Sequence, residues 1–66
     1  MGQLYLNKGT CLAKMQKYTE AKQSLDDAIK MDNEYGKAYL RRGEVNFELK
    51  DFIQSKLDWE KVRSIN

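Results

Sequence analysis

Hydrophobic and small residues recur at helical spacing in two stretches of the chain. Within each stretch they stand at positions i, i+3, i+7 and i+10, which places them on one face of an α-helix. Strict alternation of apolar and polar residues, the mark of a half-buried strand, is absent. The residues are Tyr18, Ala21, Leu25 and Ala28 in the first stretch, and Phe52, Ser55, Trp59 and Val62 in the second. The pattern predicts an all-α protein.

The two stretches are copies of one unit, because the chain matches itself when it is offset by 34 residues, without a gap. Large residues align with large ones and small residues with small ones. The pairs include Tyr5 with Tyr39, Leu6 with Leu40, Gly9 with Gly43, Leu25 with Trp59, Met31 with Ile65 and Asp32 with Asn66. Breaks near residues 16–17 and 50–51 divide each unit into two helices. We therefore expect two helix-turn-helix repeats of an α-solenoid, residues 2–35 and 36–66, the second incomplete at its C-terminal end and followed by no capping helix.

Two glycines lie inside the predicted helices, where each costs about 1 kcal/mol relative to alanine. Gly9 and Gly43 occupy the same position of the two repeats. A glycine lets a neighbouring helix approach closely, and Ala21 and Ser55 would be the small counterparts on the second helix of each repeat. A hinge at each glycine is the alternative.

Polar residues mark where the helices begin and end. Asp51 followed by Gln54 predicts a capping box at the start of the last helix. Lys17 stands at the equivalent position of the first repeat and is a poorer cap. Asp32, Asn33 and Gly36 indicate a turn between the repeats.

Composition narrows the range of functions. The chain has 66 residues, a net charge of +2, no histidine and one cysteine. Without histidine there is no imidazole base, no histidine-ligated metal and no histidine to activate Cys11, so an enzyme is not expected and no cofactor is implied. Cys11 is expected to be a buried, inert thiol, which fits a reducing, cytoplasmic setting. No apolar run is long enough to span a membrane.

The repeat resembles the tetratricopeptide repeat, a helix-turn-helix unit of 34 residues. The match covers nearly the whole chain, and the residues that carry it are Tyr5, Gly9, Leu12, Tyr18, Ala21, Leu25 and Ala28, then Tyr39, Gly43, Phe52, Ser55, Trp59 and Val62. The family usually has a proline after the residue that matches Asp32, whereas this chain has Asn33. Without that proline, the helix over residues 23–31 could continue into the helix over residues 36–49.

Polar residues that a core does not explain line one face of each repeat's first helix. These are Gln3, Asn7, Thr10 and Lys14, and at the same 34-residue offset Lys37, Arg41, Glu44 and Glu48. Stacked helices would bring Asn7, Lys37 and Arg41 to one wall, where an amide, an ammonium and a guanidinium suit a carboxylate. The alternative is that Lys37 and Arg41 are solvated charges, with Arg41 pairing Glu44 at i+3.

The segments LYLN (4–7) and GKAYLRRG (36–43) resemble carboxylate-clamp tetratricopeptide domains of the Hsp-organising protein and of J-domain co-chaperones. That resemblance implies that Asn7, Lys37 and Arg41 grip the C-terminal carboxylates of heat-shock chaperones, in a peptide ending Glu-Glu-Val-Asp. It also implies a supporting role for Lys14. The family clamp takes a further Lys and Asn from a preceding repeat, and Gln3 does not replace them, so we expect this chain alone to bind weakly.

Two other classes of function remain. Homo-oligomerisation is one, because both ends of the repeat pair would expose apolar surface, and fusion of the middle helices would allow hairpins to swap between chains. RNA binding is the other, since Arg41 and Arg42 adjoin Lys37, although Glu44 and Glu48 interrupt the basic face. Trp59 is expected to anchor the core rather than stack on a ligand.

Overall fold

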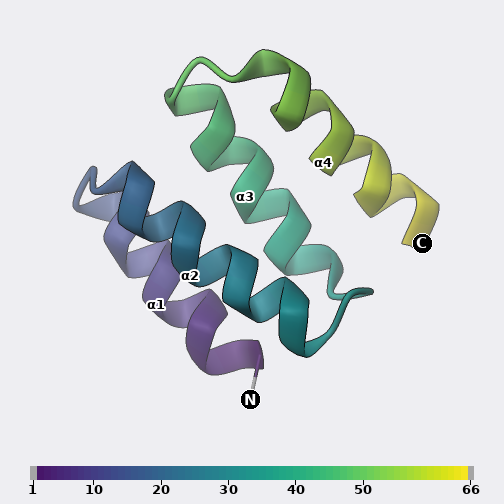
Figure 1. Ribbon diagram of the computed structural model, residues 1–66, viewed down its shortest axis with the longest axis horizontal. Coiled ribbons are helices and arrows are strands. Elements are labelled where there is room, and N and C mark those ends of the chain that lie inside the picture. The colour runs from purple at the N-terminus through teal and green to yellow at the C-terminus, as the bar shows by residue number, and fades with distance from the viewer. Residues whose placement is uncertain (1, 66) are drawn as a thin grey trace.

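The computed structural model describes residues 2–65, which form four helices. They are α1 (Gly2–Lys14), α2 (Tyr18–Met31), α3 (Gly36–Glu48) and α4 (Phe52–Ile65). Successive helices pack against one another (Figure 1), and α3 also contacts α1. The prediction of an all-α protein built from two helical hairpins is confirmed. Asn66, the last residue of the predicted second repeat, lies outside the described residues.

The two hairpin turns have the same backbone. Gln16 and Lys50 adopt left-handed conformations with φ of 61° and 65°. Two hydrogen bonds close the preceding helix at each turn. The left-handed residue donates the first, Gln16 N–H to Ala13 O at 2.9 Å and Lys50 N–H to Phe47 O at 3.0 Å, and the residue after it donates the second. Lys17 N–H donates to Leu12 O at 2.8 Å, and Asp51 N–H donates to Asn46 O at 2.8 Å. This is the Schellman arrangement, formed in both repeats with a residue other than the usual glycine at the left-handed position.

The turn between the repeats separates α2 from α3. Asp32 leaves the helix in an extended conformation with φ of −150°, and its Oδ1 accepts a hydrogen bond of 3.0 Å from Glu34 N–H. The Tyr39 hydroxyl donates to Asn33 O at 2.8 Å and ties this turn to α3. The expectation that the missing proline lets the middle helices fuse is therefore wrong for this fold, because an Asp turn replaces the proline as the stop.

The apolar core lies among the first three helices. Its buried members are Leu6, Ala21, Leu25, Ala28, Ala38 and Val45. From α4, only Ser55 and Asp58 are fully buried among the described residues. Consequently the second hairpin is held together differently from the first, by polar groups and by aromatic rings near the surface.

Both helical glycines mark close approaches, as predicted. A Cβ on Gly9 would lie 2.8 Å from Leu25 Cγ and 3.2 Å from the Ala21 carbonyl oxygen. A Cβ on Gly43 would lie 2.6 Å from Trp59 Cδ1. Ala21 thus lies beside Gly9, as predicted. The atoms nearest to Gly9 nevertheless belong to the side chain of Leu25, one turn further along α2. The hinge alternative has no support, because neither glycine has a positive φ.

Three smaller expectations need correction. The Asp51 carboxylate does cap α4, accepting from Gln54 N–H at 3.3 Å, but the Gln54 side chain donates to Asp58 rather than completing a capping box. Cys11 is exposed and not buried, since it stands on the outer face of α1. Trp59 packs over Gly43 yet remains 38% exposed, so it is a partial anchor only.

No helix within residues 2–65 is long and apolar enough to cross a membrane.

Candidate peptide-binding groove

A groove runs between α1 and α3, the first helices of the two repeats. It consists of two adjoining hollows that share Thr10 and Arg41. The first hollow is lined by Gln3, Leu6, Asn7, Thr10, Tyr35, Lys37, Leu40 and Arg41. The second is lined by Gly9, Thr10, Ala13, Lys14, Tyr18, Leu25, Arg41, Glu44, Val45 and Glu48. We call the whole the α1–α3 groove.

The structure brings the predicted site residues to this groove. Asn7, Lys37 and Arg41 line the same hollow, although Asn7 comes from the first repeat and the two cations from the second. Lys14 lines the adjoining hollow, again together with Arg41. The 34-residue offset is the reason, because equivalent positions of stacked helices face the same side.

Arg41 is already engaged in an ion pair. Its Nη1 donates to Glu44 Oε1 at 3.0 Å, one turn further along α3. The side chains are 49% and 52% exposed, so the pair contributes little to stability and exchanges readily. The alternative interpretation, in which Arg41 pairs with Glu44 on the helix surface, is therefore confirmed as far as the ion pair itself. It does not conflict with a binding role, because a bidentate carboxylate is a stronger partner for the same guanidinium.

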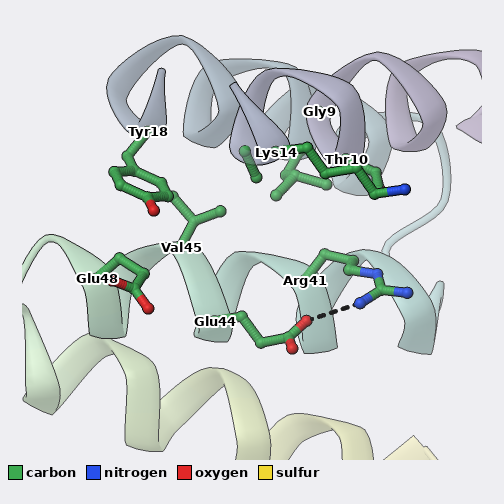
Figure 2. Close-up of a pocket in the computed structure, with 10 residues that line it drawn as sticks. Gly9, Thr10, Lys14, Tyr18, Arg41, Glu44, Val45 and Glu48 are labelled. Atoms are coloured by element: carbon green, nitrogen blue, oxygen red, sulfur yellow. Dashed lines mark hydrogen bonds and ion pairs between the residues drawn. The ribbon is translucent and has the colours of Figure 1, made fainter. Parts of the chain in front are cut away.

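The groove has a basic end and an acidic end. Figure 2 shows the nitrogen atoms of Lys14 and Arg41 on one side, Glu44 between, and Glu48 below Tyr18 on the other side. Gly9 of α1 and Val45 of α3 line the same hollow from opposite sides and are apolar. A ligand lying along the groove thus meets cations at one end and a carboxylate at the other.

Sequence reasoning missed the network that holds α3 in place. Arg42 Nη2 donates to Asp58 Oδ1 at 2.7 Å and Arg42 Nη1 donates to Asp26 Oδ1 at 2.9 Å, so one guanidinium joins α2, α3 and α4. Asn46 Nδ2 also donates to Asp58 at 2.9 Å. Burial of Arg42 opposes its charge, but the hydrogen bonds and charges of Asp58 and Asp26 outweigh this and raise the pKa of Arg42 above its ordinary value.

A signal for this network was present in the sequence. Asp58 stands three residues after the small Ser55, on the inward face of the last helix, and its equivalent in the first repeat is Ser24. Because the equivalent residue of the first repeat is a small serine on the inward face, the Asp58 carboxylate is expected to be buried, and a buried carboxylate needs a cationic partner. Arg42 is that partner, whereas its neighbour Arg41 faces the groove.

The chain's relationships agree with this geometry. The model of the tetratricopeptide repeat family matches residues 2–35, which is just over half of the chain. The chain belongs to the tetratricopeptide repeat family. The structure has a second helical hairpin, α3 and α4, over residues 36–65, which the 34-residue offset aligns with the matched unit.

Several proteins contain a stretch similar to this pair of tetratricopeptide repeats. DnaJ homolog subfamily C member 7 of Homo sapiens is 37% identical over 59 residues, which cover 89% of this chain and 12% of that protein. RNA polymerase II-associated protein 3 of Xenopus tropicalis is 35% identical over 60 residues, covering 91% of this chain and 9% of that protein. The chain therefore spans only a small part of the length of these curated relatives.

A solved structure matches the tetratricopeptide fold closely. It is the second TPR of Spaghetti (RPAP3) bound to the HSP90 peptide SRMEEVD, with a TM-score of 0.94 and 34% sequence identity. The match covers 98% of this chain and 56% of that chain. Both helical hairpins and their relative placement are thus those of a known tetratricopeptide domain.

Proposed function

We propose that this chain is a peptide-binding module whose α1–α3 groove holds the carboxylates at the end of an acidic C-terminal peptide. The observation that carries the proposal is the convergence of Asn7, Lys37 and Arg41 on one hollow from two different repeats. Heat-shock chaperones whose chains end in Glu-Glu-Val-Asp supply peptides of this chemistry. A relative of the same fold is bound to an HSP90 peptide, which supports this class of partner.

Each of the three residues has a distinct task in the proposed clamp. Arg41 binds a carboxylate through two parallel N–H donors, and it leaves Glu44 to do so. Lys37, one turn earlier on α3, adds a mobile charge, and Asn7 donates from α1 without repelling the cations. Lys14 adds positive charge further along the groove.

We expect the affinity of this chain alone to be low. Gln3 occupies the place in the first repeat that Lys37 occupies in the second, but it is a neutral amide and does not supply the further cation that the family clamp takes from a preceding repeat. The RPAP3 domain is longer than this chain, which covers 56% of it. Two cations and one amide nevertheless suffice to distinguish a terminal carboxylate from an amide.

The test is a titration of 15N-labelled protein with acetylated SRMEEVD, followed by chemical-shift changes in α1 and α3, because this readout detects weak binding. We expect saturable shifts around the α1–α3 groove and about tenfold weaker binding when the peptide's C-terminus is amidated. Arg41→Ala and Lys37→Ala should each weaken binding several-fold. Arg63→Ala and Lys56→Ala are the matched controls, since both residues are exposed on α4, and they should leave affinity unchanged.

Two results contradict the proposal. Equal affinity for the acid and the amide shows that no terminal carboxylate is held. Equal losses in Arg41→Ala and Arg63→Ala show only non-specific attraction between a basic protein and an acidic peptide.

Self-association is a second candidate function, favoured by an aromatic patch on the second repeat. Phe47 and Phe52 meet edge to face with ring centroids 5.2 Å apart, and Phe47 lies 6.0 Å from Trp59. The two phenylalanines are 50% and 55% exposed, and contiguous apolar surface of this kind favours burial against a second copy of the chain. Light scattering over a hundredfold concentration range tests this, with Phe47→Ser/Phe52→Ser as the variant. A monomer at every concentration excludes it.

A further inference from the structure

The acidic end of the α1–α3 groove has a chemistry that the proposed carboxylate clamp does not use. Glu44 and Glu48 come from α3, and the equivalent positions of α1 are Thr10 and Lys14. All four line the same hollow. The two carboxylates therefore belong to the groove itself and not only to the solvated surface of the helix.

The two carboxylates differ in their partners. Glu44 is paired with Arg41, whereas Glu48 forms no ion pair within residues 2–65. In Figure 2, Glu48 lies beneath Tyr18 and away from the nitrogen atoms of Lys14 and Arg41. A cation on a ligand would thus meet a carboxylate there without displacing any existing partner.

Binding at the basic end changes the state of Glu44 as well. When a ligand carboxylate takes the Arg41 guanidinium, Glu44 loses its ion pair and becomes, beside Glu48, a second carboxylate of this hollow without an ion pair. A purely acidic ligand would leave both glutamates uncompensated and would be repelled by them. A ligand with one positive charge at the correct distance relieves this repulsion.

The correct distance follows from helix and peptide geometry. Lys37 and Glu48 are 11 residues apart on α3, which corresponds to about 16 Å at 1.5 Å per residue. An extended peptide advances about 3.3 Å per residue, so about five residues cover the same length. Arg41 and Glu44 lie between these two points.

We propose that the α1–α3 groove selects acidic C-terminal peptides that carry an arginine or lysine about five residues before the terminal residue. This inference rests on the proposed function, because it places the terminal carboxylates at Lys37 and Arg41. The peptide lies extended along α3, its acidic end at the basic end of the groove and its upstream cation beside Glu48. Glu48 is the specificity-determining residue, and Glu44 supports it once Arg41 is occupied.

The experiment is a double-mutant cycle between peptide and protein. SRMEEVD has its arginine five residues before the terminal aspartate, and SAMEEVD removes that charge. Each acetylated peptide is titrated into the wild-type chain, Glu48→Gln and Glu44→Gln, with Glu60→Gln on α4 as the matched control. We expect SRMEEVD to bind the wild type about two- to fivefold more tightly than SAMEEVD, and this preference to shrink at high salt.

The variants give the decisive ratios. In Glu48→Gln most of the preference for SRMEEVD should be lost, with a small remainder due to Glu44, while SAMEEVD itself binds more tightly because a repelling charge is gone. Glu44→Gln should reduce the preference in part, and Glu60→Gln should retain it. A wild-type preference that persists in full in Glu48→Gln overturns the assignment, as does equal binding of the two peptides to the wild type.

The amidated peptide separates this inference from the proposed function. If both acid peptides bind equally and both amides bind poorly, the carboxylate clamp stands and the selection by Glu48 is wrong. If acids and amides bind alike, the clamp itself is wrong. The isosteric Gln variants keep the helix and can be checked by circular dichroism before each titration.

Discussion

The two repeats have the same backbone fold but differ in the contacts that hold their helices together. In the first, Leu25 is fully buried against Gly9 and the small residues around it. In the second, the equivalent residue Trp59 is partly exposed, and Asp58 occupies the interior with Arg42. The same fold unit is therefore closed once by apolar packing and once by a charged network.

The difference teaches where each kind of contact is useful. Apolar burial stabilises the first hairpin directly. A buried ion pair contributes little net stability but fixes the position of the groups it joins, because breaking it leaves charges without partners. Here it joins α2, α3 and α4, and α3 carries Lys37 and Arg41. The polar interior thus holds the helix that presents the cations of the α1–α3 groove.

The largest effect is expected from the apolar side of the comparison. Leu25→Ala removes a side chain that is 0% exposed and leaves a cavity at the centre of the core. It should lower the free energy of unfolding by about 3 kcal/mol, which is enough to unfold much of so small a domain. Urea unfolding followed by circular dichroism measures this. Leu4→Ala is the control, since Leu4 is 70% exposed and its loss should be nearly neutral.

On the polar side of the comparison, Asp58→Ala should lower the free energy of unfolding slightly less than Leu25→Ala does, by about 2–3 kcal/mol. It leaves Asn46 without an acceptor and Arg42 with Asp26 alone, but partial solvation of Arg42 reduces the loss. Ser24→Ala, at the equivalent position of the first repeat, should cost well under 1 kcal/mol. The double variant Arg42→Met/Asp58→Leu should recover part of the loss in urea unfolding. Equal effects at Asp58 and Ser24 contradict the assigned difference between the repeats.

Substitution of the two helical glycines should also affect the two repeats differently, with smaller changes in the free energy of unfolding. Gly9→Ala should destabilise by about 1–2 kcal/mol, because the buried Leu25 and the Ala21 carbonyl have little room to move. Gly43→Ala should cost less than about 1 kcal/mol, since the partly exposed Trp59 can swing outward and alanine favours the helix. Urea unfolding gives the energies. Trp59 is the one tryptophan, so only Gly43→Ala should shift the fluorescence spectrum of the folded protein.

Much of the fold follows from the sequence because the same helix-turn-helix pattern occurs in both halves of the chain. The offset of 34 residues, the helical glycines and the polar turns gave the four helices and the stacking of α1 on α3. The convergence of Asn7, Lys37 and Arg41 on one hollow follows from the same offset. What it could not give depends on side-chain directions across helices, namely that Arg42 and not Arg41 pairs with Asp58 and that Cys11 is exposed. The turn at Asp32 was predicted, but not that it ends α2 in place of a proline.

The two hairpin turns have the same backbone conformation, so the same substitution should change the free energy of unfolding equally in both repeats. Gln16→Gly and Lys50→Gly each relieve a left-handed conformation at φ near 60°. Each should raise the free energy of unfolding by about 0.5–1 kcal/mol, because glycine adopts this conformation without steric cost. Urea unfolding of the two single variants and the double variant measures the gain, which should be additive. A gain in one turn only contradicts their equivalence.

The smallest effect concerns the α1–α3 groove, where the repeats place opposite charges at equivalent positions. Lys14 of α1 corresponds to Glu48 of α3, and only the lysine lies toward Arg41 (Figure 2). Lys14→Gln should weaken SRMEEVD about twofold at low salt and hardly at all at high salt, because an exposed lysine acts through a screened charge. Lys8→Gln, on another face of α1, is the control and should not change the affinity. A loss for Lys14→Gln as large as that for Arg41→Ala gives Lys14 a direct place in the clamp, whereas no loss at low salt confines the clamp to Asn7, Lys37 and Arg41.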